Sequence, residues 1–288
     1  MTLPPAAILL AVLTYFGFST FDSLCRLVML QGVPQANVLA PVFVLAILPV
    51  LGLVHIQGHW KNLKPHQPKL VILRALIAVV EFGLVFYTFR HLTLAESYTL
   101  FFTVPIWVAL LGMFFLGEHL SRRQLAGIAL GFLGAIVAIR PGASTLGLAH
   151  AAGLLQGLVG ACSIVLMRHL GKRENTGTVL LAFLGAMTLA NIALLRGWHP
   201  LTPAQMGNMV LASLALGLAH VCFFLAVKRA PAPLFAPFQY TQIFWMLVYG
   251  SLLFHEQIQP PVIAGLLLVS AGGWLLLKPA SQGKITTS

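Results

Sequence analysis

Residues 73–142 read LRALIAVVEFGLVFYTFRHLTLAESYTLFFTVPIWVALLGMFFLGEHLSRRQLAGIALGFLGAIVAIRPG. Short polar connectors divide this stretch into apolar runs. Each run has about the 20 residues that a helix needs to cross the hydrocarbon core of a bilayer. A chain in lipid has no water to satisfy its backbone amides and carbonyls, so each run must make its own hydrogen bonds as a helix. The stretch therefore predicts consecutive transmembrane helices.

The same pattern continues in both directions and predicts an all-α membrane protein with ten transmembrane helices. The connectors are short, and the longest polar one, near Gln57–Pro68, leaves no room for a soluble domain. The first run is expected to be a membrane helix rather than a cleaved signal peptide, because Met1–Pro5 lacks a basic segment. The expected helices are Ala6–Leu30, Asn37–Gln57, Lys69–Arg90, Leu94–Leu116, Arg122–Ile139, Leu148–His169, Thr178–Arg196, Met206–Val227, Pro233–Phe254 and Pro260–Leu277.

The composition excludes a soluble globular protein. Of the 288 residues, 59% are hydrophobic and 8% are charged, whereas soluble domains carry about 25% charged residues. The net charge of +11 does not indicate a nucleic-acid partner, because the basic residues stand singly or in pairs between apolar runs. Cys25, Cys162 and Cys222 all lie within apolar runs, which favours packing over a disulfide framework or a zinc site.

The basic residues predict the orientation, since cytoplasmic loops of membrane proteins are enriched in Lys and Arg. With a cytoplasmic N-terminus, twelve of the 17 basic residues face the cytoplasm, four face outside, and Arg74 lies within a helix. The prediction is an inner (plasma) membrane protein with both termini cytoplasmic. The cytoplasmic set is Lys61, Lys64, Lys69, Arg122, Arg123, Arg168, Lys172, Arg173, Lys228, Arg229, Lys278 and Lys284, and the outer set is Arg26, Arg90, Arg140 and Arg196.

An internal repeat appears when each residue is compared with the one 138 positions later. We therefore expect two five-helix units, residues 1–141 and 142–288. Because five is odd, the second unit enters the membrane inverted, an arrangement that suits alternating access to a binding site between the halves. The matched residues are Phe86 with Phe224, Thr103 with Thr241, Trp107 with Trp245, Gly112 with Gly250, Glu118 with Glu256, Ala126 with Ala264, Gly127 with Gly265, Leu130 with Leu268, Gly134 with Gly272 and Pro141 with Pro279.

The chain resembles the EamA domain of the drug/metabolite transporter superfamily. The features that carry the resemblance are Arg74, FYTFRHLTLAES (residues 86–97), Pro105, LGE ending at Glu118, and GFLGAIVAIRPG (residues 131–142). The second half departs from the pattern, with FHE in place of LGE and no proline that matches Pro105. The resemblance implies a ten-helix inner-membrane carrier for amino acids, nucleotide-derived metabolites, vitamins or drugs. It favours an exporter over an uptake carrier.

Ionisable residues inside a membrane segment are candidates for function, because each costs about 2.5–3.5 kcal/mol to insert. Glu81 lies near mid-bilayer and is expected to bind a substrate ammonium or a proton; the alternative is a structural carboxyl. Arg74, two helical turns earlier, either reaches a substrate carboxylate or extends to the headgroups. His220 stands one position from the repeat equivalent of Glu81, and is either a substrate or proton site or a packed core histidine.

Aromatic and amide side chains complete the expected binding site. A cavity for amphipathic solutes combines aromatic walls with a few convergent polar groups. The predicted substrate-binding residues are Glu81, His220, Tyr15, Tyr98, Gln156, Gln239 and Arg74.

The remaining polar and special residues are expected to be structural. Asp22 and Arg26 have the i,i+4 spacing of an ion pair on one helix, which would act as a structural or gate pair. Glu96 is expected to cap the start of the fourth helix, and Glu118 and Glu256 to cap loops. The glycine pairs Gly127/Gly131 and Gly153/Gly157 would allow close helix packing, and Pro105, Pro233 and Pro237 would bend or break their helices.

Three other classes compete with a carrier. A membrane-embedded enzyme is disfavoured, because the sequence has no zinc, phosphate-loop or nucleophile motif. A channel would show a repeated ring of charge or carbonyl groups, and a scaffold would not need Glu81 and His220. The sequence thus predicts a carrier for small metabolites, exporting amino acids or related amphipathic solutes, without cofactor or metal. Uptake of S-adenosylmethionine, riboflavin or nucleotide-derived metabolites is the alternative.

Overall fold

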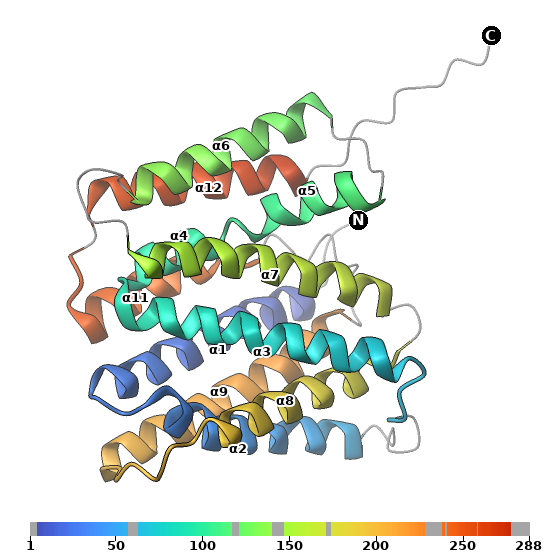
Figure 1. The fold of residues 1–288 in the computed structure, drawn as a ribbon, viewed down its shortest axis with the longest axis vertical. Coiled ribbons are helices and arrows are strands. Elements are labelled where there is room, and N and C mark those ends of the chain that lie inside the picture. Colours follow the sequence, from blue (N-terminus) through green and yellow to red (C-terminus); the bar gives the residue numbers. More distant parts are fainter. Residues whose placement is uncertain are drawn as a thin grey trace.

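The computed structural model describes residues 5–56, 63–116, 121–139, 147–170, 174–227, 238–239, 241–257 and 259–277. Within these ranges the regular structure is helical and contains no strand. The helices run side by side through the molecule (Figure 1). They are α1 Pro5–Leu30, α2 Gln35–Ile56, α3 Pro68–His91, α4 Leu94–Phe101, α5 Val104–Leu116, α6 Arg122–Ile139, α7 Leu148–Leu170, α8 Thr176–Ala193, α9 Pro203–Val227, α11 Thr241–Phe254 and α12 Pro260–Leu277.

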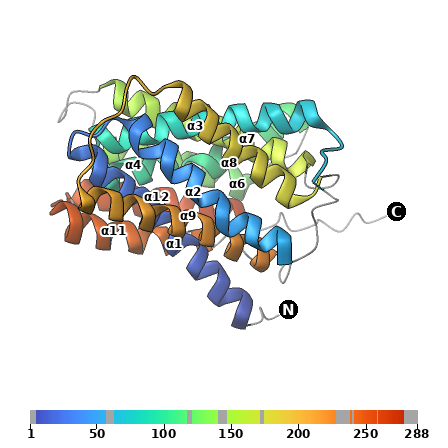
Figure 2. The same cartoon turned by 90° about the horizontal axis from the view of Figure 1, so that it is seen from below.

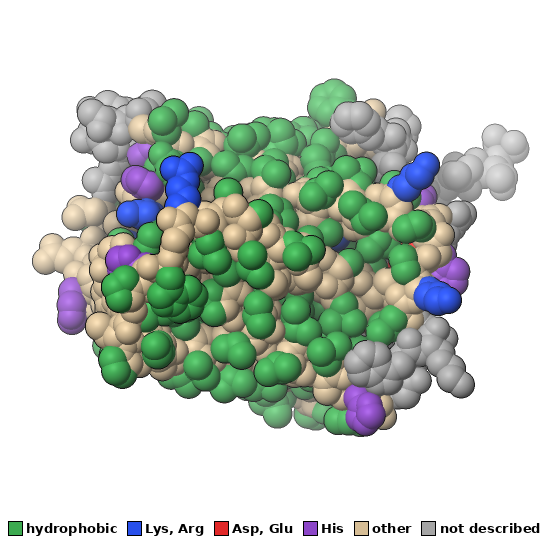
Figure 3. Space-filling view, turned by 60° about the horizontal axis from the view of Figure 1, so that its bottom comes forward, with side chains coloured by type: hydrophobic (Ala, Val, Ile, Leu, Met, Phe, Trp, Pro, Cys, Tyr) green, Lys and Arg blue, Asp and Glu red, His purple; other side chains and the backbone are tan. Residues whose placement is uncertain are grey.

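The surface is that of a membrane protein. Six helical segments in the described ranges are long and apolar enough to cross a bilayer. Large apolar side chains point outward along many helices; Leu48, Leu189 and Leu267, for example, are each more than 60% exposed. Figure 3 shows hydrophobic side chains over the middle of one face, with Lys, Arg and His near its two sides. This distribution matches an apolar belt in lipid between two hydrated ends.

The predicted single helix Leu94–Leu116 is two helices. α4 ends at Phe101 and α5 begins at Val104, with Phe102 and Thr103 between them. Pro105 explains the break, because proline lacks an N–H and its ring clashes with the carbonyl four residues earlier, but it is tolerated in the first turn of a new helix. The expectation that Pro105 bends or breaks its helix is confirmed, whereas Pro233 and Pro237 lie outside the described residues.

Local capping sets the start of α4. The Thr93 hydroxyl accepts a hydrogen bond from the Glu96 N–H at 3.2 Å, and the Glu96 carboxylate accepts one from the Thr93 N–H at 3.0 Å. This reciprocal arrangement is a capping box, which satisfies two backbone donors that the first helical turn leaves free. The prediction that Glu96 caps this helix is confirmed.

Glycines bring α6 and α12 into backbone contact, and the two helices lie side by side at the top of Figure 1. A Cβ added to Gly134 would lie 2.6 Å from the Gly265 carbonyl oxygen, and one added to Gly272 would lie 2.5 Å from the Gly127 carbonyl oxygen. Neither site has room for a side chain. This close approach is the small-residue packing typical of membrane helices.

The other expected glycine pair also serves packing. A Cβ on Gly153 would lie 2.4 Å from the Leu100 side chain, and one on Gly157 would lie 2.6 Å from the Thr103 hydroxyl. These two residues hold α7 against the junction of α4 and α5. Elsewhere, α1 packs on α9, α3 on α7, and α2 on both α8 and α9. Figure 2, seen from below, shows α2, α8 and α9 together at the front.

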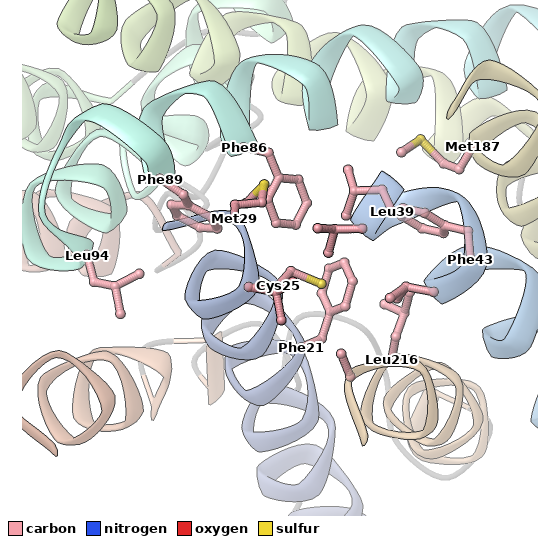
Figure 4. Packing of buried hydrophobic residues seen from close by; sticks show 14 of the residues in the cluster. Phe21, Cys25, Met29, Leu39, Phe43, Phe86, Phe89, Leu94, Met187 and Leu216 are labelled. Carbon is pink, nitrogen blue, oxygen red and sulfur yellow. The ribbon is translucent and has the colours of Figure 1, made fainter. Parts of the chain in front are cut away.

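A core of buried aromatic and aliphatic residues joins α1, α2 and α3 to α8 and α9. Figure 4 shows Phe21 and Cys25 of α1 facing Phe43 of α2 and Phe86 of α3. Phe21 lies 5.9 Å from Phe43 and 5.6 Å from Phe86 between ring centroids, in edge-to-face geometry. Cys25 is fully buried in this core, as expected of a packing residue. The core fixes one face of α3, and the neighbouring face of α3 borders a cavity.

Candidate substrate-binding cavity

A cavity of about 280 Å³ lies between α1, α3, α4, α7, α8 and α9 and is completed by Gln239 and Gln242. All seven residues predicted from the sequence to bind substrate line it. They come from parts of the chain as distant as Tyr15 and Gln239, so only the fold brings them together. Six further aromatic side chains contribute to the wall: Phe18, Phe21, Phe82, Phe89, Phe101 and Phe183.

The bundle has two ends, and the cavity lies between them. We call the end where α3 begins at Pro68 the proximal end, and the end where α3 finishes at His91 the distal end. A second cavity of about 270 Å³ shares Arg74 and His220 with the first and continues to Met167, Val179 and Phe223. These three residues belong to the proximal parts of α7, α8 and α9, so the second cavity extends the first one toward the proximal end.

Arg74 and His220 stand where the two cavities meet. The Arg74 guanidinium lies 5.2 Å from the centroid of the Phe183 ring, a cation–π distance. The Arg74 Nε is buried and has no hydrogen-bond partner among the described residues. His220 packs against Phe18 and Phe183, with centroids 5.0 and 5.8 Å apart. Its Nδ1 lies 2.9 Å from the Leu216 carbonyl; a carbonyl only accepts, so Nδ1 donates and Nε2 remains for the cavity.

Glu81 lies opposite α7, against Gly160. A Cβ added to Gly160 would stand 2.7 Å from the Glu81 Oε1, so the carboxylate occupies the space that a glycine leaves open. In the part of the chain that the structure describes, no ion pair shorter than 4.0 Å joins Glu81 or Arg74 to a partner. The two opposite charges therefore line the same cavity without cancelling each other directly.

Gln156, Tyr15 and Gln239 add neutral groups to the wall. Gln156 is 2% exposed, lies one turn from Gly160 on α7, and its Nε2 has no partner among the described residues. Tyr15 packs edge-on against Phe18 at 6.3 Å, and Gln239 belongs to the short turn before α11. A buried amide N–H without a partner costs free energy, which a ligand or water acceptor would recover.

Asp22 is a cavity residue that sequence analysis assigned incorrectly. The predicted ion pair between Asp22 and Arg26 is absent; instead the Asp22 Oδ2 accepts a hydrogen bond from the Tyr98 hydroxyl at 2.7 Å. Asp22 lines the cavity together with Tyr98. The i,i+4 spacing indicated a local pair, but tertiary contacts supply better partners for both residues. Glu81 was selected because it is an acidic residue deep within an apolar run. Asp22 meets the same criterion.

Arg26 joins three elements at the distal end of the bundle. Its Nη1 forms an ion pair with Glu256 at 2.7 Å, and its Nε and Nη2 donate to the carbonyls of Phe89 and Leu92 at 2.6 and 2.9 Å. The Glu256 carboxylate also accepts a hydrogen bond from the Leu94 N–H at 3.0 Å. Glu256 therefore caps α4, as well as joining α1, α3 and α4 through Arg26. Its expected repeat partner Glu118 lies outside the described residues.

Comparison with known proteins identifies the family. The model of the EamA-like transporter family matches residues 5–140 and again residues 147–278. The chain belongs to the EamA-like transporter family. It is therefore a multi-pass membrane transporter, and the family resemblance inferred from its motifs is confirmed.

Individual relatives agree with this membership. The chain is 26% identical over 269 residues to the pseudopaline exporter of Pseudomonas aeruginosa, covering 92% of this chain and 93% of the relative. It is 24% identical over 216 residues to the S-adenosylmethionine uptake transporter of Rickettsia conorii, covering 72% and 71%. A solved crystal structure matches with a TM-score of 0.62 and 17% identity over 91% of this chain and 95% of the other, which supports the fold.

Proposed function

We propose that this transporter moves amino acids or closely related zwitterions through the central cavity by alternating access. The observation that carries the proposal is the lining of that cavity: an acidic and a basic residue that form no ion pair among the described residues, a histidine, three amides and several aromatic side chains around one space. Ionised groups held away from water need compensation. A zwitterionic solute supplies it for both signs of charge at once.

Each end of the zwitterion has a matching group in the cavity. The Glu81 carboxylate accepts hydrogen bonds from a substrate ammonium, and the Arg74 guanidinium donates to a substrate carboxylate in fork geometry. Seven residues, roughly 10 Å of helix, separate the two on α3, and the long arginine side chain covers part of that length. The His220 Nε2 and the Gln156 amide lie on the facing helices, where they complete the polar contacts. The aromatic walls receive the substrate's side chain.

The packing of glycines supports ten transmembrane helices in two inverted repeats, residues 1–141 and 142–288. In the repeat, Gly127 corresponds to Gly265, and Gly272 corresponds to Gly134. The contact between Gly127 and Gly272 therefore has an equivalent contact between Gly265 and Gly134, and both contacts occur. In the same way, α1 corresponds to α7 and α9 corresponds to α3, and α1 packs on α9 as α7 packs on α3. Two separate matches to the family model, one in each half, agree with this arrangement. Inverted repeats place the substrate at their interface, which is where the cavity lies.

The basic residues support an inner-membrane protein with the proximal end in the cytoplasm, since both termini are expected there. In that orientation the second cavity leads toward the cytoplasm, while the ion pair of Arg26 and Glu256 closes the outer end. Export is the favoured direction, because the pseudopaline exporter aligns over nearly its whole length. Uptake is the second candidate, favoured by the S-adenosylmethionine uptake transporter. Transport without chemical conversion of the solute is proposed in both cases.

Ligand-dependent thermal unfolding of the purified protein tests the proposal. A ligand that binds only the folded state raises the unfolding temperature by mass action. We expect amino acids to stabilise the wild type, and Glu81→Gln to abolish the shift. Glu96→Gln is the matched control, because Glu96 belongs to a capping box rather than to the cavity.

Two results would count against the proposal. Stabilisation by amino acids that survives in Glu81→Gln would make that carboxyl structural. Stabilisation by riboflavin or nucleosides, with no response to any amino acid, would assign a different substrate class to the cavity. Counterflow of radiolabelled amino acid in proteoliposomes would then separate a carrier from an enzyme, which would convert the labelled molecule.

A further inference from the structure

We infer that the distal part of the cavity, formed by Asp22, Tyr98 and Ser97, is a second subsite that binds a cationic group at the far end of the substrate. The inference rests on the proposed function and narrows its substrate class. The preferred solute is an amino acid whose side chain ends in an ammonium, guanidinium or sulfonium group.

The charges in the cavity are unbalanced in a way that a second cation corrects. Glu81 and Asp22 each contribute a carboxyl group, whereas Arg74 contributes the one guanidinium among the residues described as lining the cavity. A zwitterion held between Glu81 and Arg74 neutralises both of these and leaves Asp22 without a counter-ion. An acidic group within the membrane is costly unless it is paired, so the site favours a solute with an additional positive charge.

Asp22 receives no cation from its own helix. Arg26, one turn away, is committed to Glu256 and to the carbonyls of Phe89 and Leu92. The Asp22 Oδ2 accepts from the Tyr98 hydroxyl, which orients the carboxylate but adds no positive charge. Among the described residues, no ion pair to Asp22 is present. The carboxylate therefore faces the cavity with capacity for a cationic donor.

Ser97 provides an independent indication of a ligand. It is 3% exposed and lines the cavity next to Tyr98, yet its hydroxyl has no hydrogen-bond partner within the described structure. Buried hydroxyl groups are normally paired, and a polar group on the substrate would satisfy this one. Phe89 stacks on Tyr98 with centroids 5.8 Å apart, and Phe21 and Phe101 complete the wall. Aromatic faces attract organic cations.

The spacing along α3 fits one substrate that reaches both subsites. Phe89 marks the level of Tyr98 and lies eight residues beyond Glu81, roughly 12 Å along the helix. A charge-assisted hydrogen bond at each end takes up about 2.8 Å of this distance. The substrate must then cover the remaining length of roughly 6 Å between its two cationic groups. An extended side chain of four carbon atoms, as in lysine, has about this length. A short neutral amino acid fills only the subsite at Glu81.

Binding of matched pairs of ligands tests the inference on the full-length purified protein. Norleucine is close to lysine without its terminal ammonium, and citrulline is close to arginine without its charge. Titration calorimetry should show the wild type binding lysine and arginine roughly 10- to 100-fold more tightly than these neutral partners, the usual effect of a charge-assisted hydrogen bond. Asp22→Asn should remove this preference, so that lysine and norleucine bind with equal affinity.

Thermal unfolding of Asp22→Asn checks that the variant is folded. Glu96→Gln removes an acidic group near the same end without touching the cavity, and it should keep the preference for lysine. Equal binding of lysine and norleucine by the wild type, with norleucine binding lost in Glu81→Gln, would overturn the second subsite and leave the proposed function intact. Failure of the wild type to bind any of the four amino acids would overturn both. A preference for lysine that survives in Asp22→Asn would overturn the assignment of Asp22 as the ligand of the cation.

Discussion

The contact between Gly160 and Glu81 allows the position of the carboxylate to be changed by a single methyl group. In Gly160→Ala, the new Cβ would stand 2.7 Å from the Glu81 Oε1, whereas ordinary contacts begin at 3.4 Å. The difference of roughly 0.7 Å falls on the carboxylate, because the nearest described atom outside the Glu81 carboxyl group, the Val104 Cγ2, is already at an ordinary 3.5 Å. The variant therefore shifts Glu81 without removing its charge.

The expected loss of affinity follows from the hydrogen bond that is displaced. A hydrogen bond to a charged group contributes about 1.5–3 kcal/mol, so losing it weakens amino acid binding roughly 10- to 150-fold. The free energy of unfolding should fall by about 0–2 kcal/mol. Alanine favours a helix interior by about 1 kcal/mol over glycine, which offsets part of an overpacking cost of about 1–3 kcal/mol.

Gly83→Ala is the matched control, because a Cβ at Gly83 meets nothing within 4 Å, although Gly83 lies only two residues from Glu81. Titration calorimetry and thermal unfolding of both variants separate the effect on binding from the effect on folding. Amino acid affinity within twofold of wild type in Gly160→Ala would refute the assignment of the Glu81 carboxylate as the ammonium ligand. An equal loss in both variants would attribute the effect to the helix backbone rather than to the displaced carboxylate.

Two further predictions concern polar contacts outside the cavity. Glu256→Gln leaves the buried Arg26 without its ion-pair partner and should lower the free energy of unfolding, measured by thermal unfolding, by about 3 kcal/mol. Glu96→Gln keeps a side chain that fits the capping box and loses only a charge in the first helical turn, so it should cost about 0.3–1 kcal/mol. Equal losses would contradict a special role for the pair. Glu174 lies in the connector between α7 and α8, where burial opposes its ionisation but backbone N–H groups of Gln67 and His66 donate to it and hold its pKa below the ordinary value. A carboxyl whose pKa is lowered by folding stabilises the protein above its unfolded pKa and loses that contribution as the pH falls through the folded pKa. Wild type should therefore be more stable than Glu174→Gln at pH 7, and the difference should shrink as the pH falls below about 4.3 and vanish once the pH is below the lowered pKa of Glu174 in the folded protein. A difference that does not change with pH would refute this account.

The sequence predicted the helices well, because lipid imposes their length. The bounds predicted for Arg122–Ile139 and Pro260–Leu277 coincide with those of α6 and α12. The break between α4 and α5 was foreseen as a consequence of Pro105 but not located. Proline removes one backbone hydrogen bond and adds one steric clash. The position at which the helix breaks in response depends on the helices packed against it, and here Gly157 of α7 packs against Thr103.

The cavity was predicted less completely than the helices. Glu81 and His220 were recognised because ionisable groups are rare in membrane segments, and the fold places them in one cavity with the other predicted residues. Asp22 met the same criterion but was assigned to a local pair with Arg26. A short-range spacing rule cannot reveal that Glu256 is a nearer partner for Arg26, since that contact exists only in the folded chain.

The chemistry of the contacts indicates which parts of the protein move during transport. The contact of α6 with α12 is made by glycine backbones, which pack at short range and have no polar side chains that could exchange partners with water. The distal closure is made by Arg26, Glu256 and carbonyl groups, all of which water can satisfy once they separate. Opening the distal end replaces hydrogen bonds within the protein by hydrogen bonds to water, at a small net cost in free energy. Separating α6 from α12 would lose van der Waals contacts that no new interaction replaces. We therefore expect alternating access to pivot on the glycine contact and to open at the ion pair.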